Sequence, residues 1–254
     1  MRARVLPLLA SYITLIAVAE AVTSFVNPAY GVSFHTAIFF SLLTLSASRV
    51  LGNSSSLFLN LSLAPLIRVV SLSLPLAYFP RYAWYLVAGA AVLLAALTLM
   101  WAQGVGFNEV GVNFNRPLAQ ALIGLTGAPF GAIEYYILKP EPLAANMPLP
   151  DLILLAVALA FFTGLVEEMV FRGLMQHSAV EVLGLRGGLL AVNTVFSILH
   201  IGWLSIYDVV FVFSIGLFFG ILVLKTGSIT GVSLSHGVTN VFLFLIMPSI
   251  HKNL

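Results

Sequence analysis

Two adjacent glutamates, Glu167 and Glu168, lie inside an apolar stretch and are well suited to acid–base chemistry. Glu168 and Arg172 are four residues apart, so on a helix they share a face and can form an ion pair. Glu167 points about 100° away from Glu168 and so faces a side of the helix without a local cation. A desolvated carboxylate without a counter-ion is a candidate general base. The alternative is a frayed helix end among lipid headgroups, but apolar residues continue as far as Leu183.

A histidine, His200, follows in the next apolar stretch, four residues after Phe196. A single histidine in an apolar helix is more often structural than catalytic. However, the sequence from Gly184 to Gly188 predicts a turn, so the flanking helices should form an antiparallel hairpin. At 1.5 Å per residue, Glu167 lies roughly 27 Å and His200 roughly 22 Å from the centre of that turn. The two side chains are therefore expected at nearly the same depth.

The last apolar stretch contains His236 and Asn240, which share a helix face at this spacing. Gly237 would let another backbone or a substrate approach closely. Taken alone, this pair would be read as ordinary hydrogen bonding between membrane helices. Because three polar clusters would otherwise be buried separately, each at its own cost, we expect them to converge on one water-filled cavity.

The composition requires a membrane protein. Of 254 residues, 60% are hydrophobic and 8% are charged, and the mean hydropathy is +1.06, which excludes a water-soluble enzyme and a disordered chain. The absence of cysteine excludes disulfides, cysteine-ligated zinc, iron–sulfur clusters and a thiol nucleophile. The 11 basic and 9 acidic residues are scattered singly, so nucleic acid is not an expected partner.

The apolar stretches predict an all-α polytopic bundle of eight or nine transmembrane helices, because about 20 apolar residues span a bilayer. Residues 1–150 are expected to form N-terminal helices, and residues 151–254 a catalytic core made of the last four helices. The predicted spans are 5–26, 33–47, 57–79, 82–102, 117–138, 151–178, 188–203, 207–224 and 230–249.

Basic residues in the loops predict the orientation. With the N-terminus inside, seven fall on the inner side (Arg2, Arg4, Arg49, Arg116, Arg172, Arg186, Lys225) and three on the outer side (Arg81, Lys139, Lys252). We therefore expect a multi-pass protein of the cell (plasma) membrane with a cytoplasmic N-terminus. Ala19-Glu20-Ala21 also resembles a signal-peptide cleavage site, but an uncleaved first helix is favoured in a multispan protein.

Three further ionisable residues within the spans, Glu20, Arg68 and Glu134, are interpreted as structural partners. Glu20 is paired with Arg68 as a hypothesis, with no motif or spacing behind it.

The three polar clusters together resemble the motifs of a known family. E-E-x-x-x-R, F-x-x-x-H and H-x-x-x-N, in that order, are similar to those of the type II CAAX prenyl endopeptidase and bacteriocin-processing family, abbreviated CPBP and also called Abi. The residues that carry the resemblance are Glu167, Glu168, Arg172, Phe196, His200, His236 and Asn240. The resemblance covers about residues 151–249 and implies an intramembrane endopeptidase whose active site lies inside the helix bundle.

The resemblance also implies roles. Glu167 and His200 would hold and deprotonate a water that attacks a peptide carbonyl. His236 and Asn240 would donate hydrogen bonds to the resulting oxyanion. Glu168 with Arg172 would brace the helix and set the position of Glu167.

Metal dependence is left open by the resemblance, since the family has been named both a metalloprotease and a glutamate protease. Glu167, His200 and His236 could supply three ligands to a catalytic zinc ion. The two histidines lie in different apolar stretches and no H-E-x-x-H motif occurs, so we expect no metal and no other cofactor.

Other intramembrane proteases fit less well: the chain lacks H-E-x-x-H, a paired intramembrane aspartate and a G-x-S-G motif. From a different class, a non-proteolytic scaffold or a proton-coupled transporter using Glu167 and His200 as a relay is the alternative. The expected partners are the lipid bilayer and a membrane-associated protein or peptide substrate. The substrate's identity, its prenylation and the oligomeric state are not readable from the sequence.

Overall fold

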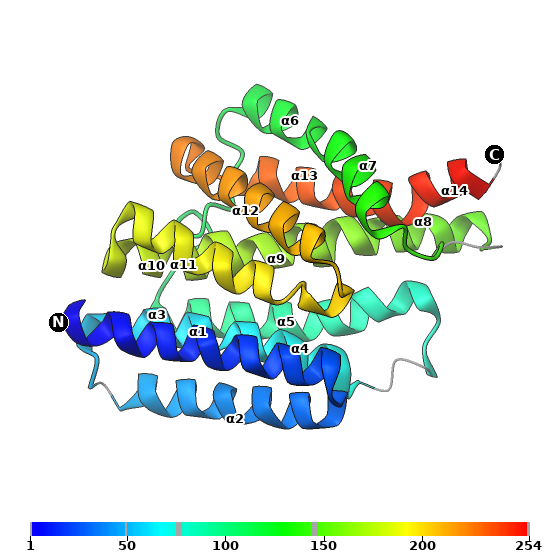
Figure 1. Cartoon of the computed structure of the whole chain (residues 1–254). Helices are drawn as coiled ribbons and strands as arrows, with labels where there is room; N and C mark the ends of the chain where they lie inside the picture. The colour runs from blue at the N-terminus through cyan, green and yellow to red at the C-terminus, as the bar shows by residue number, and fades with distance from the viewer. Residues whose placement is uncertain (1, 49, 75–77, 144–146, 253–254) are drawn as a thin grey trace.

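A computed structural model describes residues 2–48, 50–74, 78–143 and 147–252. These residues contain helices and no strand, and nine of the helical segments are long and apolar enough to cross a membrane (Figure 1). The predicted all-α polytopic bundle is therefore confirmed. The nine segments are Val5–Phe25, Pro28–Ala47, Gly52–Ser73, Ala83–Gln103, Pro117–Leu138, Leu149–Leu183, Leu185–Trp203, Ile206–Thr226 and Thr230–His251.

The described residues of the N-terminal part include five α-helices and a short 3₁₀ turn. They are α1 (Arg2–Phe25), α2 (Pro28–Ala47), η1 (Gly52–Ser54), α3 (Ser55–Leu61), α4 (Leu63–Ser73) and α5 (Arg81–Gln103). The second span is longer than predicted because Asn27 caps it: the Asn27 side chain accepts a hydrogen bond from Ala29 N at 2.8 Å, and Pro28 occupies the first helical position. Arg49 and residues 75–77, which enter the orientation and third-span predictions, lie outside the described residues.

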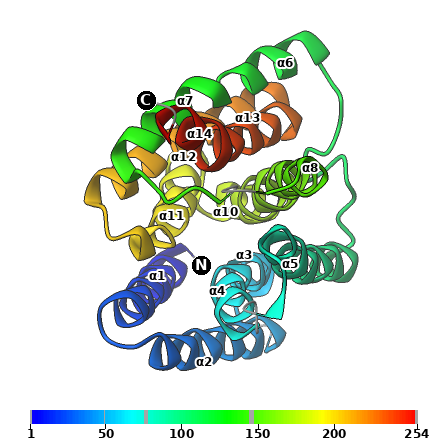
Figure 2. The ribbon, with the colours of Figure 1, turned by 90° about the vertical axis from the view of Figure 1, so that its right-hand side faces the viewer.

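The C-terminal part begins with α6 (Pro117–Leu125) and α7 (Gly127–Leu138) and then contains the longest span. After that span come α11 (Leu185–Ile198), η5 (Ile201–Trp203), α12 (Ile206–Thr226), α13 (Thr230–Val241), η6 (Phe242–Ile246) and α14 (Met247–Lys252). Figure 2 shows α1–α5 on one side of the molecule and α6–α14 on the other. Helix α1 packs against α11 and η5, while α5 packs against the longest span, so the two parts meet along these helices.

The longest span is interrupted by two π-helical segments, one on each side of the glutamates. It runs through α8 (Leu149–Ala158), a π-helical segment η3 (Leu159–Leu165), α9 (Val166–Glu168), a second π-helical segment η4 (Met169–Met175) and α10 (Gln176–Leu183). π-Helical turns are rare and occur frequently at functional sites. Glu167 and Glu168 therefore lie on a single α-helical turn held between two wider ones.

Close backbone packing brings this span against α13. A Cβ atom added at Gly237 would lie 2.8 Å from Ala160 Cα, and one added at Gly164 would lie 2.7 Å from the Ser233 carbonyl oxygen. Neither position has room for a side chain. The expected close approach at Gly237 is confirmed, and it places the glutamates beside the helix that contains His236.

The hairpin between α10 and α11 is tighter than predicted. Gly184 has φ 78° and ψ 171°, a conformation that favours glycine, and α11 begins at the next residue. The predicted turn over residues 184–188 is therefore too long, because Gly184 alone separates α10 from α11. The helix also ends early, at Ile198, so His200 lies in the turn that leads into η5 rather than within a helix.

Candidate active site

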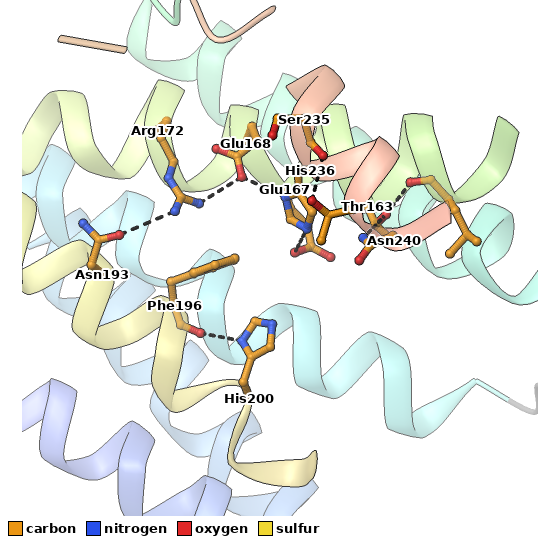
Figure 3. A network of polar contacts seen from close by, with 12 residues as sticks. Thr163, Glu167, Glu168, Arg172, Asn193, Phe196, His200, Ser235, His236 and Asn240 are labelled. Atoms are coloured by element: carbon orange, nitrogen blue, oxygen red, sulfur yellow. Dashed lines mark hydrogen bonds and ion pairs between the residues drawn. The ribbon is translucent and has the colours of Figure 1, made fainter. Parts of the chain in front are cut away.

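A cavity of about 600 Å³ opens between the two parts of the molecule. Four of the predicted site residues line it, from three different spans: Glu167, His200, His236 and Asn240. Figure 3 shows His200 facing the other three across this space. The N-terminal and middle helices contribute further ionisable residues to its wall, namely Glu20, Arg68 and Glu134.

Glu168 and Arg172 form the predicted ion pair, with 3.1 Å between Glu168 Oε1 and Arg172 Nη1, and both are buried. The guanidinium also lies over the Phe196 ring, 4.4 Å from its centroid, and its Nη2 is 3.5 Å from Asn193 Oδ1. Glu168 Oε1 accepts a second hydrogen bond from His236 Nδ1 at 2.8 Å. The pair therefore holds His236 directly, a contact that the spacing of the motifs did not reveal.

Glu167 points away from this buried pair, as predicted, and its side chain is 29% exposed toward the cavity. Its Oε2 atom lies 4.0 Å from His236 Nε2, so His236 stands between the two glutamates. Because Nδ1 donates to the Glu168 carboxylate, the neutral ring leaves a lone pair on Nε2. His236 can thus donate from Nε2 to a ligand only when both nitrogens are protonated.

The His200 ring is also held through its Nδ1 atom. Its Nδ1 atom is 2.9 Å from the Phe196 carbonyl oxygen, which can only accept, so Nδ1 carries the proton. Nε2 is then left with a lone pair, on a side chain that lines the cavity. The Phe196 ring packs against both His200 and His236, with centroids 5.0 Å and 6.1 Å away.

Asn240 is oriented by a residue that the motifs did not indicate. Its Nδ2 atom donates to Thr163 Oγ1 at 2.7 Å, and that hydroxyl donates in turn to the Leu159 carbonyl. Thr163 lies four residues before Glu167, a spacing that could have identified it as a residue of the same helix face.

The three other ionisable residues divide into a pair and a single carboxylate. Arg68 Nε donates to Glu20 Oε1, which confirms the predicted partnership, and Arg68 Nη2 donates to the Leu199 carbonyl. The prediction of a structural partner for Glu134 is wrong for the described residues, among which it makes no hydrogen bond or ion pair. Its side chain is buried, and it lines the cavity.

The predicted zinc alternative can be compared with this geometry. Glu167, His200 and His236 line one cavity, but within the described ranges no three histidine, aspartate or glutamate side chains are grouped to hold a metal ion. Nδ1 of both histidines is hydrogen-bonded within the protein, which leaves Nε2 of each ring as the nitrogen that could bind a metal ion.

The fold and the site define a class: a multi-pass membrane protein with acid–base residues enclosed by its helices. A family model described as type II CAAX prenyl endopeptidase Rce1-like matches residues 149–242, a segment that contains all six predicted site residues. The resemblance predicted from the three motifs is thereby confirmed over residues 149–242, and the matching model describes a family of proteases. No curated protein and no solved structure matches the chain.

Proposed function

We propose that this protein is an intramembrane endopeptidase that hydrolyses a peptide bond in a membrane-associated or prenylated protein. The observation that carries the proposal is the convergence of Glu167, His200, His236 and Asn240 on one cavity within the helix bundle. The Rce1-like family match over the same segment supports it.

Glu167 and His200 would activate the attacking water. A water between them can donate one hydrogen to the Glu167 carboxylate and the other to His200 Nε2, which leaves an oxygen lone pair to attack the carbonyl carbon. Glu167 takes the proton as the C–O bond forms and returns it to the amine nitrogen as the C–N bond breaks. General-base catalysis of this kind contributes typically about 10²–10⁴ in rate.

Asn240 and His236 would stabilise the oxyanion. Thr163 fixes one Nδ2 hydrogen of Asn240 and leaves the second for a ligand. His236 donates from Nε2 in its imidazolium form. One preorganised oxyanion donor is worth about 3 kcal/mol of transition-state stabilisation.

Glu168 and Arg172 would orient His236. Glu168 Oε1 receives hydrogen bonds from both Arg172 and His236, so the ion pair fixes the carboxylate and the carboxylate fixes the ring. This arrangement adds to the role implied by the family resemblance, in which the pair sets the position of Glu167.

The proposal includes chemistry without a metal or other cofactor, in a cell membrane, with the N-terminus in the cytoplasm. The excess of basic residues on the predicted inner side supports that orientation.

Comparing peptide termini in membranes from cells that carry wild type or Glu167→Gln tests the proposal even while the substrate is unidentified. We expect at least one processed terminus to disappear in the variant at equal protein level. Glu181→Gln is the matched control, because Glu181 lies in the same span, has an exposed side chain and does not line the cavity. Identical termini in wild type and Glu167→Gln under several growth conditions would favour a non-proteolytic scaffold.

A further inference from the structure

We propose that Arg68 and Glu20, two residues outside the segment matched by the family, are positioning residues that hold His200 in its working place. The inference rests on the proposed function, because it assigns His200 a partner in catalysis. Neither residue is expected to touch the reacting atoms.

His200 needs external support because it lies outside regular helix. Helix α11 ends at Ile198, and the chain then turns through His200 (φ −94°, ψ 0°) into the short η5 and leaves it at Leu204 with φ 56°. The last carbonyls of a helix lack donors within that helix. Such a turn can shift as a unit unless contacts from another element fix it.

Arg68 supplies that contact from helix α4. Its Nη2 donates to the carbonyl of Leu199, the residue directly before His200. A cation at the C-terminal end of a helix also interacts favourably with the helix dipole. The His200 peptide is thus held on its N-terminal side by Arg68, while the His200 ring is held by the Phe196 carbonyl.

Glu20, on α1, fixes the direction of the Arg68 guanidinium. Glu20 is fully buried, its Oε1 accepts from Arg68 Nε, and the same oxygen lies 3.4 Å from His35 Nε2. Two different nitrogens of Arg68 are therefore committed to two acceptors, one on α1 and one in the turn that follows α11. Lysine cannot reproduce this arrangement, because it has a single nitrogen and no planar fork.

The free-energy cost of burying the Glu20 carboxylate supports an orienting role for the Glu20–Arg68 pair. Glu20 Oε2 is buried and lacks a hydrogen-bond partner among the described residues. The attraction within a buried ion pair does little more than offset the cost of removing its charges from water. A gain in thermal stability is therefore a poor explanation for the Glu20–Arg68 pair. Its geometry instead connects α1 and α4 to the turn that contains His200.

The first test is ¹⁵N NMR of protein labelled at its five histidines, which requires no substrate. His200→Asn assigns the His200 signals. In Arg68→Gln, we expect the His200 nitrogen signals to move or broaden while those of His236 stay in place. Ser71→Ala is the control, since Ser71 lies on the same helix, lines the same cavity and contacts only the backbone of Arg68.

The second test is kinetic and uses the peptide identified by the comparison of termini. Arg68→Gln should lower kcat by about 10- to 100-fold, the effect of moving a reacting group by about 1 Å, with KM nearly unchanged. Arg68→Lys should recover only part of the loss. Glu20→Gln, which retains the guanidinium, should give a smaller effect of the same kind and replaces Arg68→Gln if that variant does not fold.

The outcomes separate the inference from the proposed function. Unchanged His200 signals together with wild-type kcat in both Arg68→Gln and Glu20→Gln would overturn the inference. A wild-type protein that cleaves nothing, with His200 signals that still depend on Arg68, would overturn the proposed function and leave the structural link intact.

Discussion

Removing Arg172 should destabilise the fold far more than removing an exposed partner from the same span. Arg172→Met leaves Glu168 as a buried carboxylate without its cation, and both side chains are fully buried in the wild type. Removing one member of a buried ion pair costs about 3–5 kcal/mol, which is roughly two to three and a half orders of magnitude in the folding equilibrium. The lost contact with the Phe196 ring adds to this penalty.

The chain contains a matched control for this measurement. His177 and Glu181 form a second pair at the same i,i+4 spacing in the same span, at 3.5 Å, but their side chains are 48% and 66% exposed. An exposed pair is worth about 0–1 kcal/mol, so Glu181→Gln should change stability little. The assay is unfolding of purified protein in mixed micelles with increasing denaturing detergent.

A double variant isolates the cause. Glu168→Gln with Arg172→Met removes both charges, while the glutamine oxygen can still accept from His236 Nδ1. This variant should recover much of the stability lost in Arg172→Met, because no charge is left buried alone. If Arg172→Met is as stable as Glu181→Gln, or if the double variant is less stable than the single one, the buried-pair argument is refuted.

Four further predictions concern other contacts in and around the site. Gly237→Ala should lower stability by about 1–3 kcal/mol and reduce activity, because its Cβ would meet Ala160 Cα at 2.8 Å; normal unfolding in micelles would contradict the close packing. Thr163→Val should lower kcat by releasing the Asn240 amide, and Thr163→Ser should retain it; equal kcat for valine and serine would remove Thr163 from the site. Glu134→Gln should leave thermal stability equal or higher, since the carboxylate has no hydrogen bond or ion pair among the described residues; a lower Tm would reveal a partner. Treatment with a strong zinc chelator should leave cleavage unchanged, and loss restored by added zinc would establish metal dependence.

The fold was largely predictable because membrane helices leave a strong pattern. Apolar length alone predicted eight or nine spans, and the described residues contain nine candidate spans, since each helix must satisfy its backbone inside the bilayer. The Glu168–Arg172 pair was predictable for a similar reason: a spacing of four residues is a local geometric rule. Both predictions depend only on positions close together in the sequence.

The contacts that were missed join distant positions or depend on irregular backbone. Arg68 and Leu199 are 131 residues apart, and no local pattern predicts that two such residues meet. Residue type also did not show that α11 would end before His200. The spacing therefore predicted which helix faces carry the site, while only the packing shows what supports them.

The two π-helical segments determine where the longest span can lose a residue without turning the site. A π turn closes hydrogen bonds to the fifth residue rather than the fourth, so it accommodates an extra residue. Deleting one residue from η3, for example Phe161, would let an ordinary α-helix form there. Because the wider turn already absorbs the extra residue, the part of the span that follows would keep its orientation relative to α8 and Glu167 would still face the cavity. Deleting a residue from a regular α-helical segment instead turns the part that follows by about 100°. A single-residue deletion in Leu159–Leu165 should thus disturb the orientation of Glu167 less than a single-residue deletion in the regular helix α8.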